Sequence, residues 1–256
     1  AGSSYQGVFR NPLVDPYLLG AASGAGLGAT IALTVGRAAT ETWTFDPVIA
    51  AAFAVSIATV LLTYLVGGAF GGRAQSGATL VLAGVAVVTF TTAIQTFLLQ
   101  RNVDRVQEVY SWILGRLSSA TWADVRLVAP YVGVSVVVLM VHRRHLDVMR
   151  VGDDEAATLG MNVRRTRLII IVAATLGTAA VVSVSGLIGF VGLIIPHMIR
   201  LGAGVGYRGL IPLSVLIGAA FLILADIPGR VLTSPAETPI GVVTAFLGAP
   251  LFILLL

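Results

Sequence analysis

The 256-residue chain is 57% hydrophobic and only 11% charged, which excludes a water-soluble globular domain. All sixteen basic residues are arginine and there is no cysteine, so lysine-dependent phosphate-binding loops, Schiff bases, disulfides and thiolate metal sites are excluded. The net charge of +4 comes from arginines scattered through short loops, which predicts an effect on membrane orientation rather than nucleic-acid binding.

Eight apolar segments follow one another along the chain, and each predicts a helix in the membrane. They lie at 17–36, 48–70, 78–99, 127–141, 168–187, 190–201, 209–227 and 239–256. A backbone in lipid has to satisfy its hydrogen bonds within the segment, and a helix does so. The predicted fold class is therefore all-α: a polytopic membrane bundle of about eight helices, in a single transmembrane domain over 1–256.

The first segment carries a stripe of small residues. Gly20, Gly24 and Gly28 are four residues apart, so they share one face of a helix. A glycine costs a helix about 1 kcal/mol relative to alanine unless packing recovers it. The stripe therefore predicts a second helix whose backbone lies close to this one.

Polar side chains recur along the segment 78–99 at three- and four-residue spacing. They are Thr89, Thr92, Gln95 and Thr96. Hydrogen bonding between helices explains such a stripe about as well as a translocation path does. The following residues, 100–122, are amphipathic rather than wholly apolar, which predicts a short helix lying flat at the outer surface.

The segment 142–167 is the most basic part of the chain and predicts its orientation. It carries Arg143, Arg144, Arg150, Arg164, Arg165 and Arg167. Under the positive-inside rule it is cytoplasmic. Alternation from this loop puts ten arginines inside, with Arg10 and Arg200 among them, and six outside, with Arg230 among them.

A short helix exposed to solvent is predicted inside this loop. Asp153, Asp154 and Glu155 suit the first turn of a helix, where negative charge is stabilised. Gly160 can end that helix in a left-handed conformation. An ordinary solvated loop is the alternative.

The segment 190–201 is too short to cross a bilayer alone and contains several helix-breaking residues. Gly186, Gly189, Gly192 and Pro196 interrupt it. We expect a half-helix or re-entrant piece packed inside protein, where polar groups avoid lipid. Arg200 would then reach headgroups or an acidic neighbour at the inner boundary.

The histidines and one acid in the apolar segments invite functional interpretations. His197 is more often a satisfied structural residue than a metal ligand, and His142 with His145 fits a cationic cluster better than a metal pair, so no metal site is predicted. Asp226, followed by Pro228, could serve a proton relay, but a structural or helix-end role is favoured.

Four stretches together resemble the permease subunits of ATP-binding-cassette (ABC) importers for iron-siderophore complexes, haem and cobalamin, the FecCD type. They are RNPLVDPYLLGAASGA (10–25), GDDEAATLGMNVRRTR (152–167), GLIGFVGLIIPHMIR (186–200) and PAETPIGVVTAFLGAPLF (235–252). They occur in family order over nearly the whole chain. Members look like ten-helix proteins, so the resemblance implies that the first one to two helices are missing here.

The resemblance implies several functional residues. An element that couples to the ATPase subunit would comprise Asp153, Asp154, Glu155, Ala156, Leu159, Gly160, Arg164 and Arg165, with Ala156, Leu159 and Gly160 as its contact face. A cytoplasmic gate would comprise Asn11 and Leu13, and across the pore Ser76 and Gly77, where family members often carry hydroxyl residues. A translocation path would follow Thr89, Thr92, Gln95 and Thr96, and Arg230 would dock a substrate-binding protein.

The function implied is transport of a metal chelate across the inner (cytoplasmic) membrane by alternating access. Expected partners are a cytoplasmic ABC ATPase that uses ATP and Mg²⁺, an extracytoplasmic binding protein, and a second permease copy or close paralogue. The chain itself would bind no cofactor and catalyse no reaction. An ion- or proton-coupled secondary transporter is the alternative, with Asp226 as its only candidate acid. An intramembrane enzyme would need a base for Ser183 or Ser185, and only His197 is available.

Overall fold

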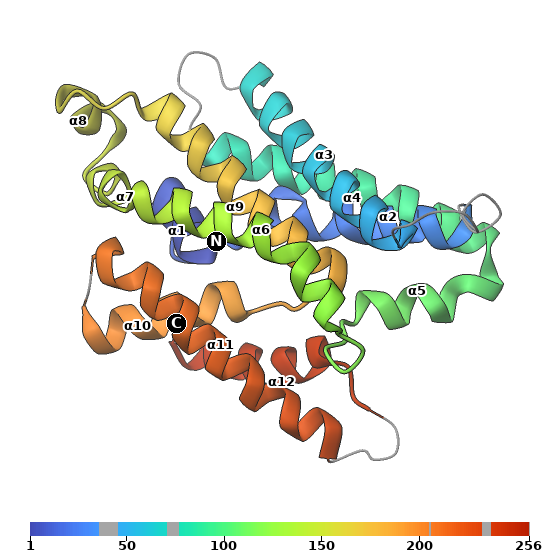
Figure 1. The fold of residues 1–256 in the computed structure, drawn as a ribbon. Coiled ribbons are helices and arrows are strands. Elements are labelled where there is room, and N and C mark those ends of the chain that lie inside the picture. The colour runs from blue at the N-terminus through green and yellow to red at the C-terminus, as the bar shows by residue number, and fades with distance from the viewer. Residues whose placement is uncertain (36–45, 71–76, 205, 232–236, 256) are drawn as a thin grey trace. The chain divides into compact units, whose positions relative to one another are not determined.

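The computed structural model describes residues 1–35, 46–70, 77–204, 206–231 and 237–255, and all the regular structure in those ranges is helical (Figure 1). Every one of the eight predicted apolar segments forms a helix. They are α2 (Ala21–Thr34), α3 (Pro47–Phe70), α4 (Gly77–Arg101), α6 (Trp122–Val141), α9 (Val163–Ser185), α10 (Val191–Ala203), α11 (Tyr207–Val231) and α12 (Ile240–Leu255). The all-helical class is therefore confirmed.

The expected count of about eight membrane spans is not confirmed. Within the described residues, five helices are long and apolar enough to cross a membrane, namely α3, α4, α6, α9 and α11. The apolar helices α2, α10 and α12 are shorter than the roughly 20 residues that a crossing needs. At the start of the first predicted segment, a 3-10 turn, η1 (Pro16–Leu19), replaces α-helix and shortens α2.

Several helices lie outside the apolar segments. They are α1 (Gly2–Phe9), η3 (Val103–Arg105), α5 (Val106–Ile113), α7 (Arg143–Met149) and α8 (Asp153–Thr158). The sequence did not predict α1, because its small and polar residues resemble a loop. All eight of its residues are nevertheless buried. A side chain on Gly2 would overlap the backbone of Gly192 in α10, so the small residues let two helices meet closely.

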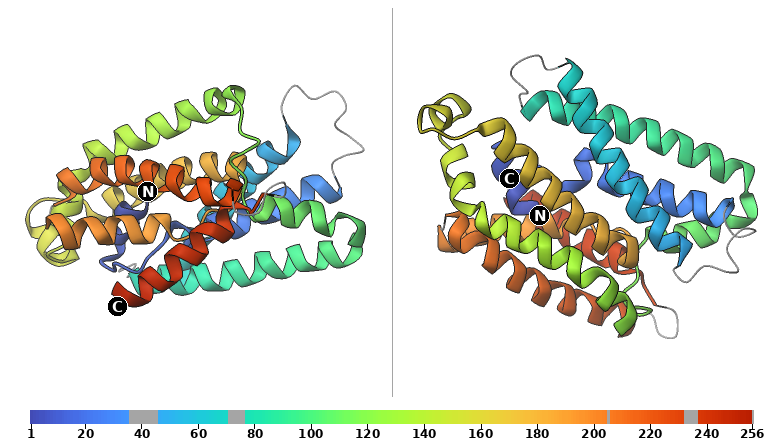
Figure 2. Two further views of the ribbon diagram at one scale, coloured as in Figure 1. Left: turned by 90° about the horizontal axis from the view of Figure 1, so that it is seen from below. Right: turned by 45° about the horizontal axis from the view of Figure 1, so that its top comes forward.

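The chain divides into two compact units. Unit 1 contains residues 1–16, 129–177 and 189–256, and unit 2 contains 17–128 and 178–188. Helices α6 and α9 contribute residues to both. In unit 2, α2, α3 and α4 pack against one another (Figure 2). In unit 1, α10 packs against α1, α11 and α12.

The glycine stripe of α2 faces α3, as the spacing predicted. A Cβ on Gly24 would lie 2.5 Å from Thr59 Oγ1 and 2.8 Å from the carbonyl oxygen of Val55. A Cβ on Gly28 would overlap the carbonyl group of Ala51. The hydroxyl of Ser56 also donates a hydrogen bond of 2.8 Å to the carbonyl of Ala21. Because these glycines have no side chains, α2 and α3 can pack with their backbones close together.

This packing predicts that Gly24→Ala destabilises the protein. The added methyl group would force α2 away from α3, and overpacking of this kind costs about 1–3 kcal/mol. Gly133→Ala in α6 is the matched control, because a Cβ there has no atom within 4 Å. We expect a lower unfolding temperature in detergent for Gly24→Ala and an unchanged or slightly higher one for Gly133→Ala. Equal unfolding temperatures would contradict the close contact.

Prolines do not end the helices in which they lie. The sequence predicted breaks at Gly192 and Pro196, but α10 runs through both, and the non-helical residues are 186–190. Likewise α11 continues past Pro228 to Val231. A proline in a membrane helix removes one backbone hydrogen bond, and neighbouring groups can compensate for that loss.

The predicted amphipathic helix between α4 and α6 is present as η3 and α5. Trp112 packs against the buried cluster of Ala25, Ala29, Ala52 and Val182, whereas the side chain of Trp122 is exposed. The backbone N–H of Arg116 donates to the carbonyl of Ser185 at 2.9 Å. Core packing and this backbone bond therefore hold the segment to the end of α9.

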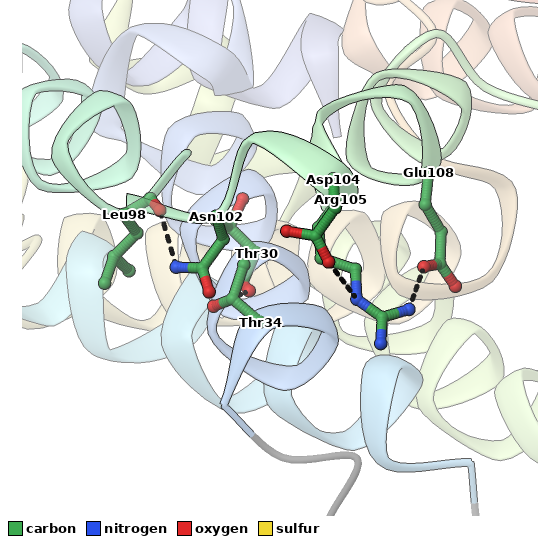
Figure 3. A network of polar contacts seen from close by, with 7 residues as sticks. All are labelled: Thr30, Thr34, Leu98, Asn102, Asp104, Arg105 and Glu108. Carbon is green, nitrogen blue, oxygen red and sulfur yellow. Dashed lines mark hydrogen bonds and ion pairs between the residues drawn. The ribbon is translucent and has the colours of Figure 1, made fainter. Parts of the chain in front are cut away.

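Polar contacts form the turn from α4 into α5 (Figure 3). The side-chain amide of Asn102 donates to the carbonyl of Leu98 at 2.8 Å, which satisfies a backbone group at the end of α4. Arg105 lies between two acids, 3.1 Å from Glu108 and 3.7 Å from Asp104. The turn is thus held by short-range contacts within the segment.

Candidate functional site

The short helix α8 has the ends that the sequence predicted. Its first turn contains three acids, Asp153, Asp154 and Glu155. At its other end Gly160 has φ +82°, its N–H donates to the carbonyl of Ala157 at 2.9 Å, and the N–H of Met161 donates to the carbonyl of Ala156 at 3.2 Å. These two bonds form a complete Schellman cap, which satisfies the carbonyls at the end of the helix.

The side chains at the end of α8 and just after it differ in their exposure to solvent. Leu159, which follows the last residue of α8, is 71% exposed. Arg164 and Arg165 are exposed as well, at the start of α9. Ala156 is completely buried, so it packs within this chain and does not belong to the outward face predicted for it. The outward face therefore consists of Leu159, Gly160 and the neighbouring arginines.

Asp153 connects α8 to two other elements of unit 1. Its carboxylate accepts a 2.7 Å hydrogen bond from the guanidinium of Arg167 in α9, whose side chain is only 6% exposed. The other carboxylate oxygen lies 3.8 Å from the guanidinium of Arg10, the residue that ends α1. Charge-assisted bonds to a buried arginine are strong. Asp153 thus links the first turn of α8 to the turn that follows α1.

That turn contains the predicted gate residues Asn11 and Leu13. Arg10 has φ +51°, a left-handed conformation that turns the chain sharply after α1. The side-chain oxygen of Asn11 accepts a 2.9 Å hydrogen bond from the N–H of Leu13, and both side chains are exposed. Of the residues predicted across the pore, Gly77 begins α4 in unit 2, and Ser76 lies outside the described residues.

Behind this turn, Arg200 of α10 has neutral partners. Its guanidinium donates to the Gln6 side-chain oxygen at 2.5 Å and to the Tyr207 hydroxyl at 3.3 Å, so its partners among the described residues are neutral and the acidic neighbour predicted for it is not one of them. The Gln6 amide nitrogen lies 3.5 Å from the carbonyl of Gly192, which Pro196 leaves without its helical donor. The sequence analysis did not identify Gln6 or Tyr207, because neither residue belongs to a motif or to a periodic stripe of polar residues.

The four polar residues of α4 have two different environments in unit 2. Gln95 donates to the hydroxyl of Thr30 in α2 at 3.1 Å, so it serves helix packing. Thr89, Thr92 and Thr96 are exposed, and the hydroxyls of Thr89 and Thr96 donate to carbonyls one turn earlier in their own helix. Three of the four predicted path residues therefore lie on an exposed face.

Arg230 has a partner within its own helix. Its guanidinium lies 2.6 Å from the carboxylate of Asp226, one turn earlier in α11, and its side chain is 47% exposed. The structural role favoured for Asp226 is that of this ion-pair partner. The remaining exposure leaves part of the guanidinium available to another molecule.

Unit 2 also contains a cavity of about 630 Å³ that the sequence did not predict. Its lining includes the ends of α2 and α9, the start of α3, and Trp112 and Arg116 from the segment after α4. Three carboxylates, those of Asp46, Glu108 and Asp124, also line it. Among the described residues, no group of three or more His, Cys, Asp or Glu could hold a metal ion, here or elsewhere.

Taken together, five apolar helices of spanning length and an exposed, capped helix in a polar loop define a multi-pass membrane protein. The comparisons with known proteins specify its class. Residues 1–256 match the FecCD transport family, and the chain belongs to that family of ABC transporter permeases.

The relatives are named for different cargoes. The chain is 39% identical to the cobalamin import permease BtuC of Halobacterium salinarum, with 100% of this chain and 67% of the relative aligned. It is 35% identical to the hemin transport permease HmuU of Yersinia pestis, with 100% and 76% aligned. An uncharacterised ABC permease of Bacillus subtilis, YvrB, is 40% identical, with 100% and 72% aligned.

The fold has a close match among solved structures. An inward-facing ABC transporter assigned to the metal-chelate type superposes with a TM-score of 0.89 at 29% identity, over 99% of this chain and 79% of the other. PsaBC from Streptococcus pneumoniae superposes with a TM-score of 0.64 at 15% identity, which is a likeness of fold alone.

Proposed function

We propose that this chain is the membrane permease of an importer that carries a metal chelate across the cytoplasmic membrane by alternating access. Iron-siderophore complexes are the first cargo to test, with haem and cobalamin next, since relatives are named for haem, cobalamin and iron chelates. ATP and Mg²⁺ are used by a separate cytoplasmic subunit, and the permease itself hydrolyses nothing. A second permease copy or a paralogue completes the path.

The observation that carries this proposal is the outward face of α8. Leu159 is 71% exposed at the end of a short, fully capped helix, and the exposed Arg164 and Arg165 follow it, so this face combines an apolar side chain with positive charge that another protein can bind. Asp153 then transmits displacement of α8 to Arg10, and so to the gate residues Asn11 and Leu13. In this mechanism the ATPase subunit contacts Leu159 and Gly160, with Arg164 and Arg165 beside them, and Ala156 supports the helix from within.

The remaining site residues fit the same mechanism. Thr89, Thr92 and Thr96 form an uncharged hydroxyl surface along the path, past which a bulky chelate slides without tight binding. Ser76 and Gly77 are proposed as further residues of the gate. On the outer side, Arg230 docks the binding protein, and Asp226 orients its guanidinium. A proton-coupled mechanism is disfavoured because Asp226 is paired with Arg230.

The direct test is coexpression of the permease with its cognate ATPase subunit, followed by uptake of each chelate into vesicles. We expect a stable complex and uptake that needs ATP but survives collapse of the proton gradient. Uptake by the permease alone, driven by an ion gradient, would overturn the proposal.

Leu159→Arg tests the contact face within this experiment. A charged side chain in place of the exposed leucine should abolish copurification of the ATPase subunit, because hot-spot side chains at interfaces tolerate such changes poorly. Val103→Arg is the matched control, since Val103 is 73% exposed but lies in the segment between α4 and α6. Equal copurification of both variants would remove Leu159 from the interface.

A further inference from the structure

A second cavity, in unit 1, has an unusual concentration of positive charge. It measures about 260 Å³ and is lined by Gln6, Gly7, Arg10, Asn11, Pro12, Arg150, Arg200 and Tyr207. We call it the arginine pocket. Its lining contains three arginines and no acid, and the residues come from the end of α1, the end of α7, and α10 and α11.

The three guanidinium groups are poorly compensated within the chain. Arg200 donates to Gln6 and Tyr207, both of which are neutral. Arg10 lies 3.8 Å from Asp153, but that carboxylate makes its short bond, of 2.7 Å, to Arg167.

The guanidinium of Arg150 is exposed and has no hydrogen bond or ion pair to the residues that the structure describes. The nearest acid on the same helix, Asp147, accepts the backbone N–H of Tyr207 at 3.0 Å. The pocket therefore keeps an excess of positive charge.

We propose that the arginine pocket binds a phosphate group, either the headgroup phosphate of an anionic lipid or a soluble phosphate. Arginine forks match phosphate oxygens, and three of them can bind one multiply charged group from several sides. The Asn11 side chain adds a further donor. A pocket of this size holds a phosphate with room for the group attached to it.

The position of the pocket implies that a bound ligand affects the gate turn. Arg10, Asn11 and Pro12 belong to the gate turn, whereas Arg150 and Arg200 belong to α7 and α10. A bound phosphate would tie the turn to these helices and restrain its motion. The arginine bias assigns this face to the cytoplasm, where anionic lipids produce a negative surface potential.

The test compares ligand-dependent stability of the purified permease, without ATPase or cargo, so its result is independent of the transport function. Inorganic phosphate is titrated in detergent, and nanodiscs of phosphatidylglycerol are compared with nanodiscs of phosphatidylcholine. Arg150→Gln removes an exposed side chain and should leave the fold intact. Arg144→Gln is the matched control, because Arg144 is exposed on the same helix and does not line the pocket.

We expect one of the two phosphate sources to raise the unfolding temperature of the wild type and of Arg144→Gln. Arg150→Gln should weaken that effect by about tenfold in ligand concentration, as loss of one charge-assisted hydrogen bond predicts. Arg150→Lys should recover part of it. A response to phosphatidylglycerol alone identifies lipid, and a response to inorganic phosphate identifies a soluble ligand.

Identical responses of Arg150→Gln and Arg144→Gln to both probes would overturn the proposal. The proposal would also be overturned if the pocket binds the ATPase subunit rather than a phosphate. In that case Arg150→Gln would reduce copurification of the ATPase subunit while neither phosphate source had any effect on stability.

Discussion

Replacing Asp153 with asparagine is expected to lower ATP-driven uptake by about tenfold or more while the ATPase subunit still hydrolyses ATP. The change removes the carboxylate that joins α8 to Arg167 and Arg10. Arg167 is buried but the Asp153 side chain is 34% exposed. Loss of the carboxylate therefore costs about 1–3 kcal/mol, because the buried guanidinium keeps its charge without this partner. We therefore expect α8 to move without carrying the gate turn with it. Uptake per ATP hydrolysed, measured in proteoliposomes, reports this uncoupling directly.

The neighbouring residue supplies the control for this experiment. Asp154→Asn makes the same chemical change one position later, where the side chain is exposed and has no hydrogen bond or ion pair to the described residues. It should keep the wild-type ratio of uptake to hydrolysis. Asp153→Asn combined with Arg167→Met should recover stability but not coupling, because the buried charge is gone while the tie to Arg10 stays broken. A normal ratio in Asp153→Asn would exclude Asp153 from the transmission.

Sequence patterns predicted the parts of this fold that depend on local composition. Each long apolar run became a helix, and the spacing of Gly20, Gly24 and Gly28 predicted the contact with α3. The acids and Gly160 predicted both ends of α8. In each case the physical cause lies within one or two turns of a helix, so the sequence contains it.

The features that the sequence did not predict depend on contacts between residues that are far apart in the chain. The hydrogen bond from Arg200 to Gln6 joins residues 194 positions apart, and no local pattern indicates it. Helix α1 was not predicted for the same reason: its small residues indicate a helix only once the elements that pack against it are known. Pro196 was expected to break α10, and the Gln6 amide shows how a distant group can compensate.

Gly7→Val is expected to prevent stable assembly of unit 1, because Gly7 lies where three helices meet. A Cβ at this position would lie 2.6 Å from the Tyr207 hydroxyl and 3.0 Å from Leu146 Cδ2. Tyr207 is 4% exposed and Leu146 is completely buried, so moving either side chain away would break packing contacts, and for Tyr207 also its hydrogen bond from Arg200. Valine adds two further methyl groups beyond that Cβ. We expect aggregated or strongly destabilised protein on size-exclusion chromatography and in thermal unfolding.

The same substitution at Gly202, in α10, separates this contact from a general effect of valine in a helix. A Cβ on Gly202 has no atom within 4 Å, so Gly202→Val should remain monodisperse. The milder Gly7→Ala should lower stability by about 1–3 kcal/mol, and Tyr207→Leu should recover part of that loss by removing the ring. Because the Tyr207 hydroxyl also accepts from Arg200, recovery should be incomplete. If Gly7→Val unfolds at the same temperature as Gly202→Val, α1 does not pack against α11 as described.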